Sequence, residues 1–246
     1  GGMEVGALQP VRKAFGAAIT ESERTGAGTL RVKRWRAGVT SDENIAMTIM
    51  GDYSAAAPYT CPKSALILAN ARNKLVSQLI GDTNFLTSDW KGSIIGLALL
   101  AGVQPGDPDY ATVQARLQTH ARARATAGPG NNAGMWDVAY SGLFLAEYYL
   151  ATSDATVLPG INSFTLKLAV SQSINGTFGH SASVLRPDGS GRRMGIGYGP
   201  VNAVGIVANM ALVLGKKALL AGGQAIDPEI DGAIQRGADF FAFYVN

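Results

Sequence analysis

Residues 136–149 read WDVAYSGLFLAEYY, a stretch in which apolar residues would lie on every side of a helix. Two further stretches share this pattern: WKGSIIGLALLAG at residues 90–102 and YGPVNAVGIVANMALVLG at residues 198–215. Each stretch opens with an aromatic residue and is rich in glycine and alanine. A helix that is apolar all round must be buried. We therefore expect three buried helices.

The buried helices carry small residues that would let neighbouring backbones approach closely. Interiors are densely packed, so enlarging such a residue is expected to destabilise the fold. The positions that we expect at these contacts are Gly96, Gly142, Ala146, Gly205 and Ala208.

A more polar helix precedes each buried one, and a glycine-rich loop joins the two. The apolar period of 3.6 predicts seven helices after residue 61. They are expected at residues 62–80, 88–101, 108–127, 135–152, 155–173, 200–220 and 228–245. This repeat of polar and apolar helices predicts an outer and an inner layer, as in an α/α toroid built from helical hairpins. Because three pairs and one unpaired helix leave an open arc, the toroid is expected to be partial.

The first 52 residues have a different pattern. Pro10 opens an expected helix that ends near residue 25, and strands are expected at residues 29–36 and 44–50 around a turn at residues 38–43. Basic residues on both faces of the first strand are typical of a protected sheet edge. Two strands and one helix cannot fold alone. We therefore expect residues 1–52 to be part of an α/β module and residues 53–246 to form the helical domain.

Composition excludes several classes of protein. The sequence is 47% hydrophobic and 16% charged, which excludes a disordered chain, and its net charge of +3 does not predict nucleic-acid binding. One cysteine and two histidines exclude a disulfide framework and a Cys/His zinc site, so neither a metal nor a cofactor is expected. No uninterrupted apolar run reaches the roughly 18 residues of a membrane span. The compartment stays open, with export or the periplasm favoured.

One motif connects the sequence to a known family. QSINGTF at residues 172–178 has the spacing of the Gln-x-x-x-Gly-x-Trp motif of squalene and oxidosqualene cyclases, with Phe178 in place of tryptophan. It occurs together with YSAAAPYTCPKS at residues 53–64, LAEYYLAT at residues 145–152 and Gly179-His180 ahead of Gly197-Tyr198-Gly199. With these features the sequence resembles an uncharacterised bacterial family in which a PDZ-like domain precedes a terpene-cyclase-like α/α toroid.

The resemblance covers nearly the whole chain and implies its domain organisation. Residues 1–52 would be the C-terminal fragment of the PDZ-like module, and residues 53–246 the toroid domain, incomplete at its C-terminus. The peptide groove of a PDZ domain would lie before Gly1, and the Asp-x-Asp-Asp acid motif of the cyclases does not occur, which argues against terpene cyclisation. The resemblance therefore implies a fold and leaves the function open.

Candidate catalytic residues gather between residues 172 and 202. His180 can exchange a proton near neutral pH, Tyr198 carries a hydroxyl, and Asn202 with Arg192 or Arg193 could neutralise a carboxylate. Free N–H groups at the inner-helix N-termini would favour anions. These groups suit β-elimination on an acidic polysaccharide. Toroidal polysaccharide lyases use similar residues, which is an analogy at the level of fold.

Several alternatives remain open. Trp90 and Trp136 could stack on a sugar with Asp137 at its edge, or they could pack in the core. Asp89 and Asp137 could form an acid–base pair for glycoside hydrolysis. The sequence does not decide whether the protein is an enzyme or a non-catalytic binding or assembly domain. We expect a polysaccharide or peptide ligand, and a second copy or further chain segments over the open arc.

Overall fold

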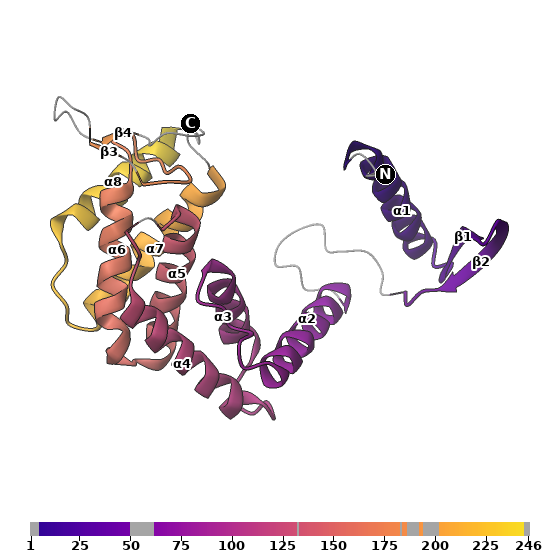
Figure 1. The fold of residues 1–246 in the computed structure, drawn as a ribbon, viewed down its shortest axis with the longest axis horizontal. Helices are drawn as coiled ribbons and strands as arrows, with labels where there is room; N and C mark the ends of the chain where they lie inside the picture. Colours follow the sequence, from indigo (N-terminus) through magenta and orange to yellow (C-terminus); the bar gives the residue numbers. More distant parts are fainter. Residues whose placement is uncertain are drawn as a thin grey trace. The chain divides into compact units, whose positions relative to one another are not determined.

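A computed structural model describes residues 5–49, 62–131, 133–182, 184–185, 192–193 and 202–243 (Figure 1). The chain divides into two compact units, Gly1–Ala71 and Arg72–Asn246, and the division falls inside a helix. This division lies further along the chain than the boundary expected after residue 52.

The first unit contains a helix and a hairpin. Helix α1 spans Val5–Arg24, and strands β1 (Thr29–Arg36) and β2 (Val39–Ala46) pair in antiparallel register. The expected turn at residues 38–43 is wrong: Ala37 and Gly38, both with positive φ, close a two-residue turn. Cross-strand ion pairs such as Arg31 with Asp42, at 2.9 Å, hold charged residues in β2 where a loop was expected. Pro10 lies inside α1 and does not begin it.

The second unit is helical, and the seven helices expected after residue 61 are confirmed to within a few residues. The helices are α2 (Pro62–Gly81), which crosses the division between the units, α3 (Trp90–Gly102), α4 (Tyr110–Ala127), α5 (Met135–Thr152), α6 (Leu158–Ser171), α7 (Asn202–Ala221) and α8 (Pro228–Phe243). A 3₁₀ turn, η1 (Ala155–Val157), precedes α6, and the two-residue strands β3 (Val184–Leu185) and β4 (Arg192–Arg193) pair antiparallel between α6 and α7.

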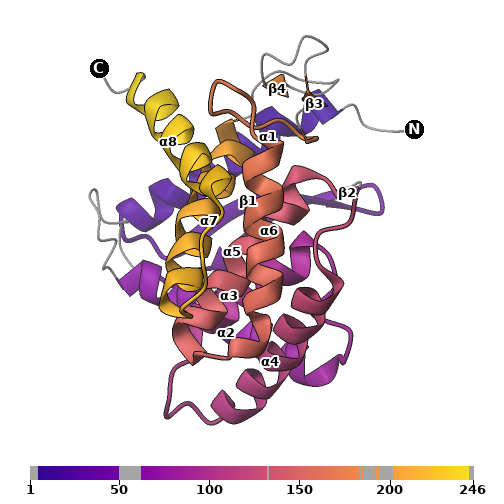
Figure 2. The ribbon, with the colours of Figure 1, turned by 90° about the vertical axis from the view of Figure 1, so that its left-hand side faces the viewer.

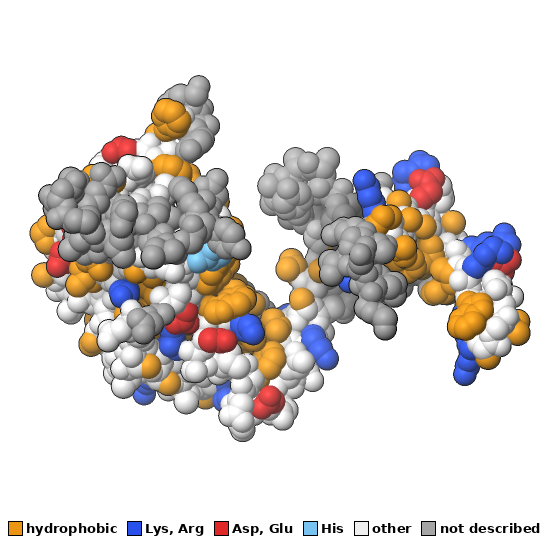
Figure 3. All heavy atoms as spheres, turned by 45° about the horizontal axis from the view of Figure 1, so that its top comes forward, with side chains coloured by type: hydrophobic (Ala, Val, Ile, Leu, Met, Phe, Trp, Pro, Cys, Tyr) orange, Lys and Arg blue, Asp and Glu red, His pale blue; other side chains and the backbone are white. Residues whose placement is uncertain are grey.

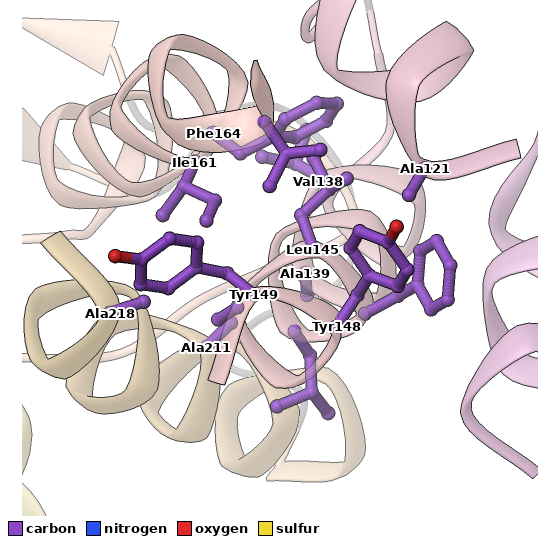
Figure 4. Packing of buried hydrophobic residues seen from close by; sticks show 14 of the residues in the cluster. Ala121, Val138, Ala139, Leu145, Tyr148, Tyr149, Ile161, Phe164, Ala211 and Ala218 are labelled. Atoms are coloured by element: carbon purple, nitrogen blue, oxygen red, sulfur yellow. The ribbon is translucent and has the colours of Figure 1, made fainter. Parts of the chain in front are cut away.

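Helices α3 to α8 form two layers. Helix α5 packs between α3 and α7, and α6 packs between α4 and α8; the layers meet where α5 and α7 contact α6 (Figures 1 and 2). Eleven of the eighteen residues of α5 are buried, which agrees with its apolar sequence. Figure 4 shows this core, in which Tyr148 and Tyr149 of α5 lie with Ile161 and Phe164 of α6 and Ala211 of α7.

Small residues separate the helices at two of the expected contacts. A Cβ at Gly96 of α3 would lie 2.6 Å from the ring of Phe144, and a Cβ at Gly142 of α5 would lie 3.4 Å from the Cβ of Phe164. Gly205 of α7 is buried, as expected, but no described atom lies within 4 Å of a Cβ built there, so the close approach expected at this position stays a prediction.

Helix α7 departs from the expectation that no segment of the chain has the length and composition of a membrane span. Residues Ala203–Ala221 form, within the described part of the chain, a helix long and apolar enough to cross a membrane. The same length and composition occur in core helices of soluble proteins, and 44% of this segment is buried in the protein. The helix is therefore weak evidence for a membrane.

A histidine lies inside the helical core. His120 of α4 is 8% exposed, and its ring packs 5.2 Å from that of Phe144. Its Nε2 atom has no hydrogen-bond partner among the described residues. Burial, followed by the positive charge of Arg124, lowers the pKa of His120 from 6.5 to about 4. His120 is therefore neutral in the folded protein at neutral pH.

The close contact at Gly96 predicts that alanine substitution destabilises the fold at residue 96 and not at residue 205. Gly96→Ala should lower the free energy of unfolding by about 1 to 3 kcal/mol, because the added methyl group would overlap a buried ring. Gly205→Ala should be neutral or stabilise by up to about 1 kcal/mol, since the space there is open and alanine favours a helix. Urea unfolding of both variants measures the difference. Equal destabilisation by the two would contradict the packing described for α3 and α5.

His120 predicts how stability depends on pH. Between about pH 7 and pH 5 the unfolded chain binds a proton at this position and the folded chain does not, so the free energy of unfolding should fall by about 2 kcal/mol. His120→Gln should reduce this loss, whereas His180→Gln, which retains the buried histidine, should not. Denaturant unfolding at both pH values tests this. If the free energy of unfolding of His120→Gln fell by the same amount between pH 7 and pH 5 as that of the wild-type chain, another group would be responsible.

Candidate functional site

Four rings form a row at the N-terminal ends of α3 and α5. Trp136 and Tyr140, one helical turn apart on α5, are 6.0 Å apart between ring centroids with an interplanar angle of 12°. Trp90, the first residue of α3, lies 6.3 Å from Tyr140, and the ring of His180 lies 6.2 Å from that of Trp136. We call Trp90, Tyr140, Trp136 and His180 the aromatic row. Its members are all partly or fully accessible to solvent.

The space-filling view (Figure 3) shows which kinds of side chain surround a histidine at the surface. In Figure 3 a histidine side chain lies at the surface of the helical unit beside a gathering of hydrophobic side chains. Of the two histidines, His120 is buried and His180 is exposed. Tyr140 is not among the site residues expected from the sequence. Its spacing of four residues from Trp136 on a helix could have indicated it, because that spacing places the two rings on one face.

His180 is held by two hydrogen bonds to the start of α5. Its backbone carbonyl accepts from the N–H of Met135 at 2.9 Å, and its Nδ1 accepts from the indole N–H of Trp136 at 3.0 Å. In the neutral ring the proton then lies on Nε2, because Nδ1 is the acceptor. Because Nδ1 already accepts this hydrogen bond, that atom is not available as a general base.

The QSINGTF segment positions the loop that carries His180. The amide of Gln172 donates to the carbonyl of Ala233 on α8 at 3.0 Å and accepts from Nε of Arg236 at 3.0 Å. Gly176, with a φ of +77°, lies against the backbone of Arg236, where any side chain would collide. Phe178 is 1% exposed and belongs to the core. The segment therefore fixes the loop between α8 and the start of α5.

The backbone N–H groups at the start of α3 are already bonded. The carboxylate of Asp89 accepts from the N–H groups of Lys91 and Gly92 at 3.1 and 3.4 Å. A hydrogen bond from Thr87 at 2.6 Å is the largest of the effects that lower the pKa of Asp89. An ionised capping carboxylate does not suit the role of a catalytic acid. An anionic ligand would therefore have to displace Asp89 from this helix terminus.

Asp137 is engaged in the core and not with the aromatic row. Its carboxylate pairs with Arg124 of α4 at 2.9 Å, and the side chains are 22% and 8% exposed, respectively. Arg124 also donates to the hydroxyl of Ser141 at 2.8 Å, and that hydroxyl lies 3.1 Å from the hydroxyl of Ser93 on α3. This polar network joins α3, α4 and α5. It leaves Asp137 as a positioning residue at the start of α5.

The other expected site residues lie partly outside the described structure. Arg192 and Arg193 form β4, opposite Leu185 and Val184, and Asn202 is the first residue of α7; the side chains of these three expected site residues are not described. Tyr198 lies outside the described residues. The structure thus brings together Trp90, Trp136 and His180 and leaves the placement of the other expected side chains open.

An apolar hollow of about 520 Å³ lies along the same layer of helices. It is lined by residues of α3, α5 and α7, including Leu97, Leu143, Leu150 and Met210, with Glu147 as its one carboxylate. Residues 136, 140, 143 and 147 follow helical spacing, so the hollow continues the face of α5 on which the aromatic row begins. In the described ranges no group of three or more His, Cys, Asp and Glu side chains could hold a metal ion.

Comparison with known proteins identifies a family. No curated protein and no solved structure matches the chain. A family model described as "Domain of unknown function (DUF6288)" matches residues 64–246, about three quarters of the chain and the whole of the helical unit Arg72–Asn246. The protein therefore belongs to the DUF6288 family.

Proposed function

We propose that the helical unit binds a saccharide chain on the aromatic row. The observation that carries this proposal is the row itself. Three large rings and a histidine follow one another at an accessible surface, and the centroids of successive rings are 6.0 to 6.3 Å apart. Tryptophan and tyrosine offer an apolar face together with a polar edge, which suits the alternating apolar and hydroxyl surfaces of a sugar. His180 extends the row with an exposed imidazole ring at one end.

The charges beside the row favour an acidic saccharide. Asp89 is used as a helix cap and Asp137 is paired with Arg124, so neither carboxylate is directed to a ligand. Lys91 is exposed, forms no ion pair in the described part of the chain, and places its ammonium group 5.7 Å from the ring of Trp90. Lys91 also attracts the ionised Asp89, and its exposed ammonium group is the cation beside this end of the row that an incoming uronic-acid carboxylate would meet.

A lyase acting on an acidic polysaccharide is the second candidate function. The exposed position of His180 beside the aromatic row supports it, because a histidine that has taken up a proton can donate it to a leaving oxygen. In that mechanism Tyr198 would remove the proton next to the carboxylate, while Asn202 and an arginine would neutralise its charge. Binding on the row requires none of these groups, so the two candidates differ in their tests.

The proposed architecture for either function is a partial α/α toroid that follows a fragment of a PDZ-like module. The alternation of α4, α6 and α8 with α3, α5 and α7 supports the toroid, because each of these two layers consists of every second helix. The α1–β1–β2 unit is compatible with part of a PDZ-like module, for which a peptide ligand stays a prediction. Under this proposal the aromatic row lies at one mouth of the toroid.

Binding can be measured with the tryptophans themselves. The chain has three, and Trp35→Phe leaves Trp90 and Trp136 of the row as reporters. Polygalacturonate should change their fluorescence, and Trp136→Ala should weaken binding by about tenfold or more, the equivalent of one stacking contact. Trp35→Ala is the matched control, since Trp35 is 72% exposed and lies on β1. Unchanged affinity of Trp136→Ala in calorimetry would refute the proposed site.

The charge preference has its own test. Lys91→Gln should weaken binding of polygalacturonate and leave binding of its methyl ester unchanged, because only the free acid carries the charges that Lys91 attracts. Added salt should weaken the first interaction and not the second. Equal effects on both polymers would show that the row binds saccharides without regard to charge.

The lyase candidate predicts a product that absorbs ultraviolet light. Elimination next to a uronic carboxylate creates an unsaturated sugar, and Tyr198→Phe should lower its rate of formation by about 10² to 10⁴ while the fold is retained. Asn202→Ala should also slow the reaction on free acids. If the wild-type chain binds an acidic polymer and forms no unsaturated product from any, the lyase proposal fails and the binding proposal stands.

A further inference from the structure

The hollow between α3, α5 and α7 contains one charged side chain. Glu147 of α5 lines it together with apolar residues, among them Leu97 of α3, Leu143 and Leu150 of α5 and Met210 of α7. Residues 143, 147 and 150 follow helical spacing and lie on one face of α5, so the carboxylate stands between two leucines. The volume of about 520 Å³ is typical of a pocket for a small molecule. We call this feature the Glu147 hollow.

The carboxylate of Glu147 has no partner among the described residues. The side chain is partly buried, and it takes part in none of the hydrogen bonds and ion pairs of the described ranges. The two lysines of α7 do not line the hollow, because Lys216 pairs with Asp231 and Lys217 is exposed. Glutamate carries a negative charge at neutral pH. The hollow is therefore an apolar space with one unpaired negative charge in its wall.

This combination distinguishes between classes of ligand. An anion would be repelled by Glu147, and a neutral apolar molecule would take water from the carboxylate without replacing its hydrogen bonds. A metal ion would find one carboxylate, since no group of three or more His, Cys, Asp and Glu side chains gathers in the described ranges. An amine with an apolar body meets both requirements: its ammonium group donates to the carboxylate, and its body is buried against the leucines.

We propose that the Glu147 hollow binds an organic amine, with the ammonium group on Glu147 and an apolar body against Leu97, Leu143 and Leu150. With a rise of 1.5 Å per residue, residues 143 and 150 lie about 10 Å apart along α5, so the body is compact. The site is separate from the proposed saccharide binding. Stacking on the aromatic row requires no carboxylate, and the amine requires no stacking ring.

The first experiment compares three probes that share one apolar body and differ in charge. They are 1-aminoadamantane, 1-adamantanol and adamantane-1-carboxylate, each titrated into the full chain by calorimetry. The amine should bind at least about tenfold more tightly than the alcohol, because it alone forms a charge-assisted hydrogen bond, and the acid should not bind. Equal affinities of the amine and the alcohol, or no binding by any of the three, would overturn the proposal.

The second experiment locates the ammonium group. Glu147→Gln should weaken binding of the amine by about tenfold and leave binding of the alcohol unchanged. Asp239→Asn is the matched control, since it removes the same charge from an exposed position of α8 that does not line the hollow. If Trp136→Ala weakened amine binding and Glu147→Gln did not, the amine would lie on the aromatic row and the proposal would be wrong. Polygalacturonate binding should be the same in Glu147→Gln as in the wild-type chain, so a failure here leaves the saccharide proposal standing.

The third experiment fills the space itself. Ala101 of α3 lines the hollow and is exposed, so Ala101→Phe should abolish binding of both the amine and the alcohol without disturbing the core. Ala98→Phe adds the same ring at an exposed position of α3 that does not line the hollow, and it should bind both probes as the wild-type chain does. Circular dichroism checks that both variants fold. Wild-type affinity in Ala101→Phe would show that the amine binds elsewhere.

Discussion

The burial of α5 on almost every side is the constraint on which the rest of the helical unit depends. Its apolar residues leave no face that is stable in water, so other helices must surround it. Helices α3 and α7 cover its flanks while α4 and α6 cover its back. Close approach is possible because Gly142 lies against Phe164 and because Gly96 of α3 lies against Phe144. The two layers follow from this one requirement.

The same helix positions the candidate site. The buried pair of Arg124 and Asp137 fixes the first turn of α5, and Trp136 lies next to Asp137 in that turn. From the other direction, Gln172 ties the loop after α6 to α8, and the loop then places His180 on the indole N–H of Trp136. Core packing and the accessible rings are therefore coupled. The motif residues act on the site through the backbone, without reaching a ligand themselves.

Apolar periodicity was sufficient to predict the helices, because burial of a long apolar face depends little on the partner. The hairpin was not predictable in this way: Ser41, Asp42 and Glu43 are typical turn residues, and only their cross-strand partners hold them in β2. For the site, the sequence identified Trp90, Trp136 and His180. It could not show that Asp137 faces Arg124, since the arginines of α4 have the spacing of a solvated face. A single sequence does not show which side chains of two different helices form an ion pair.

The inner layer brings two apolar spaces next to each other at one side chain. Met210 lines both the hollow of α3, α5 and α7 and the apolar groove between α7 and α8. A methionine adapts its shape at low cost, so it can pack toward either space. The conformation of this one side chain therefore sets the shape of both spaces.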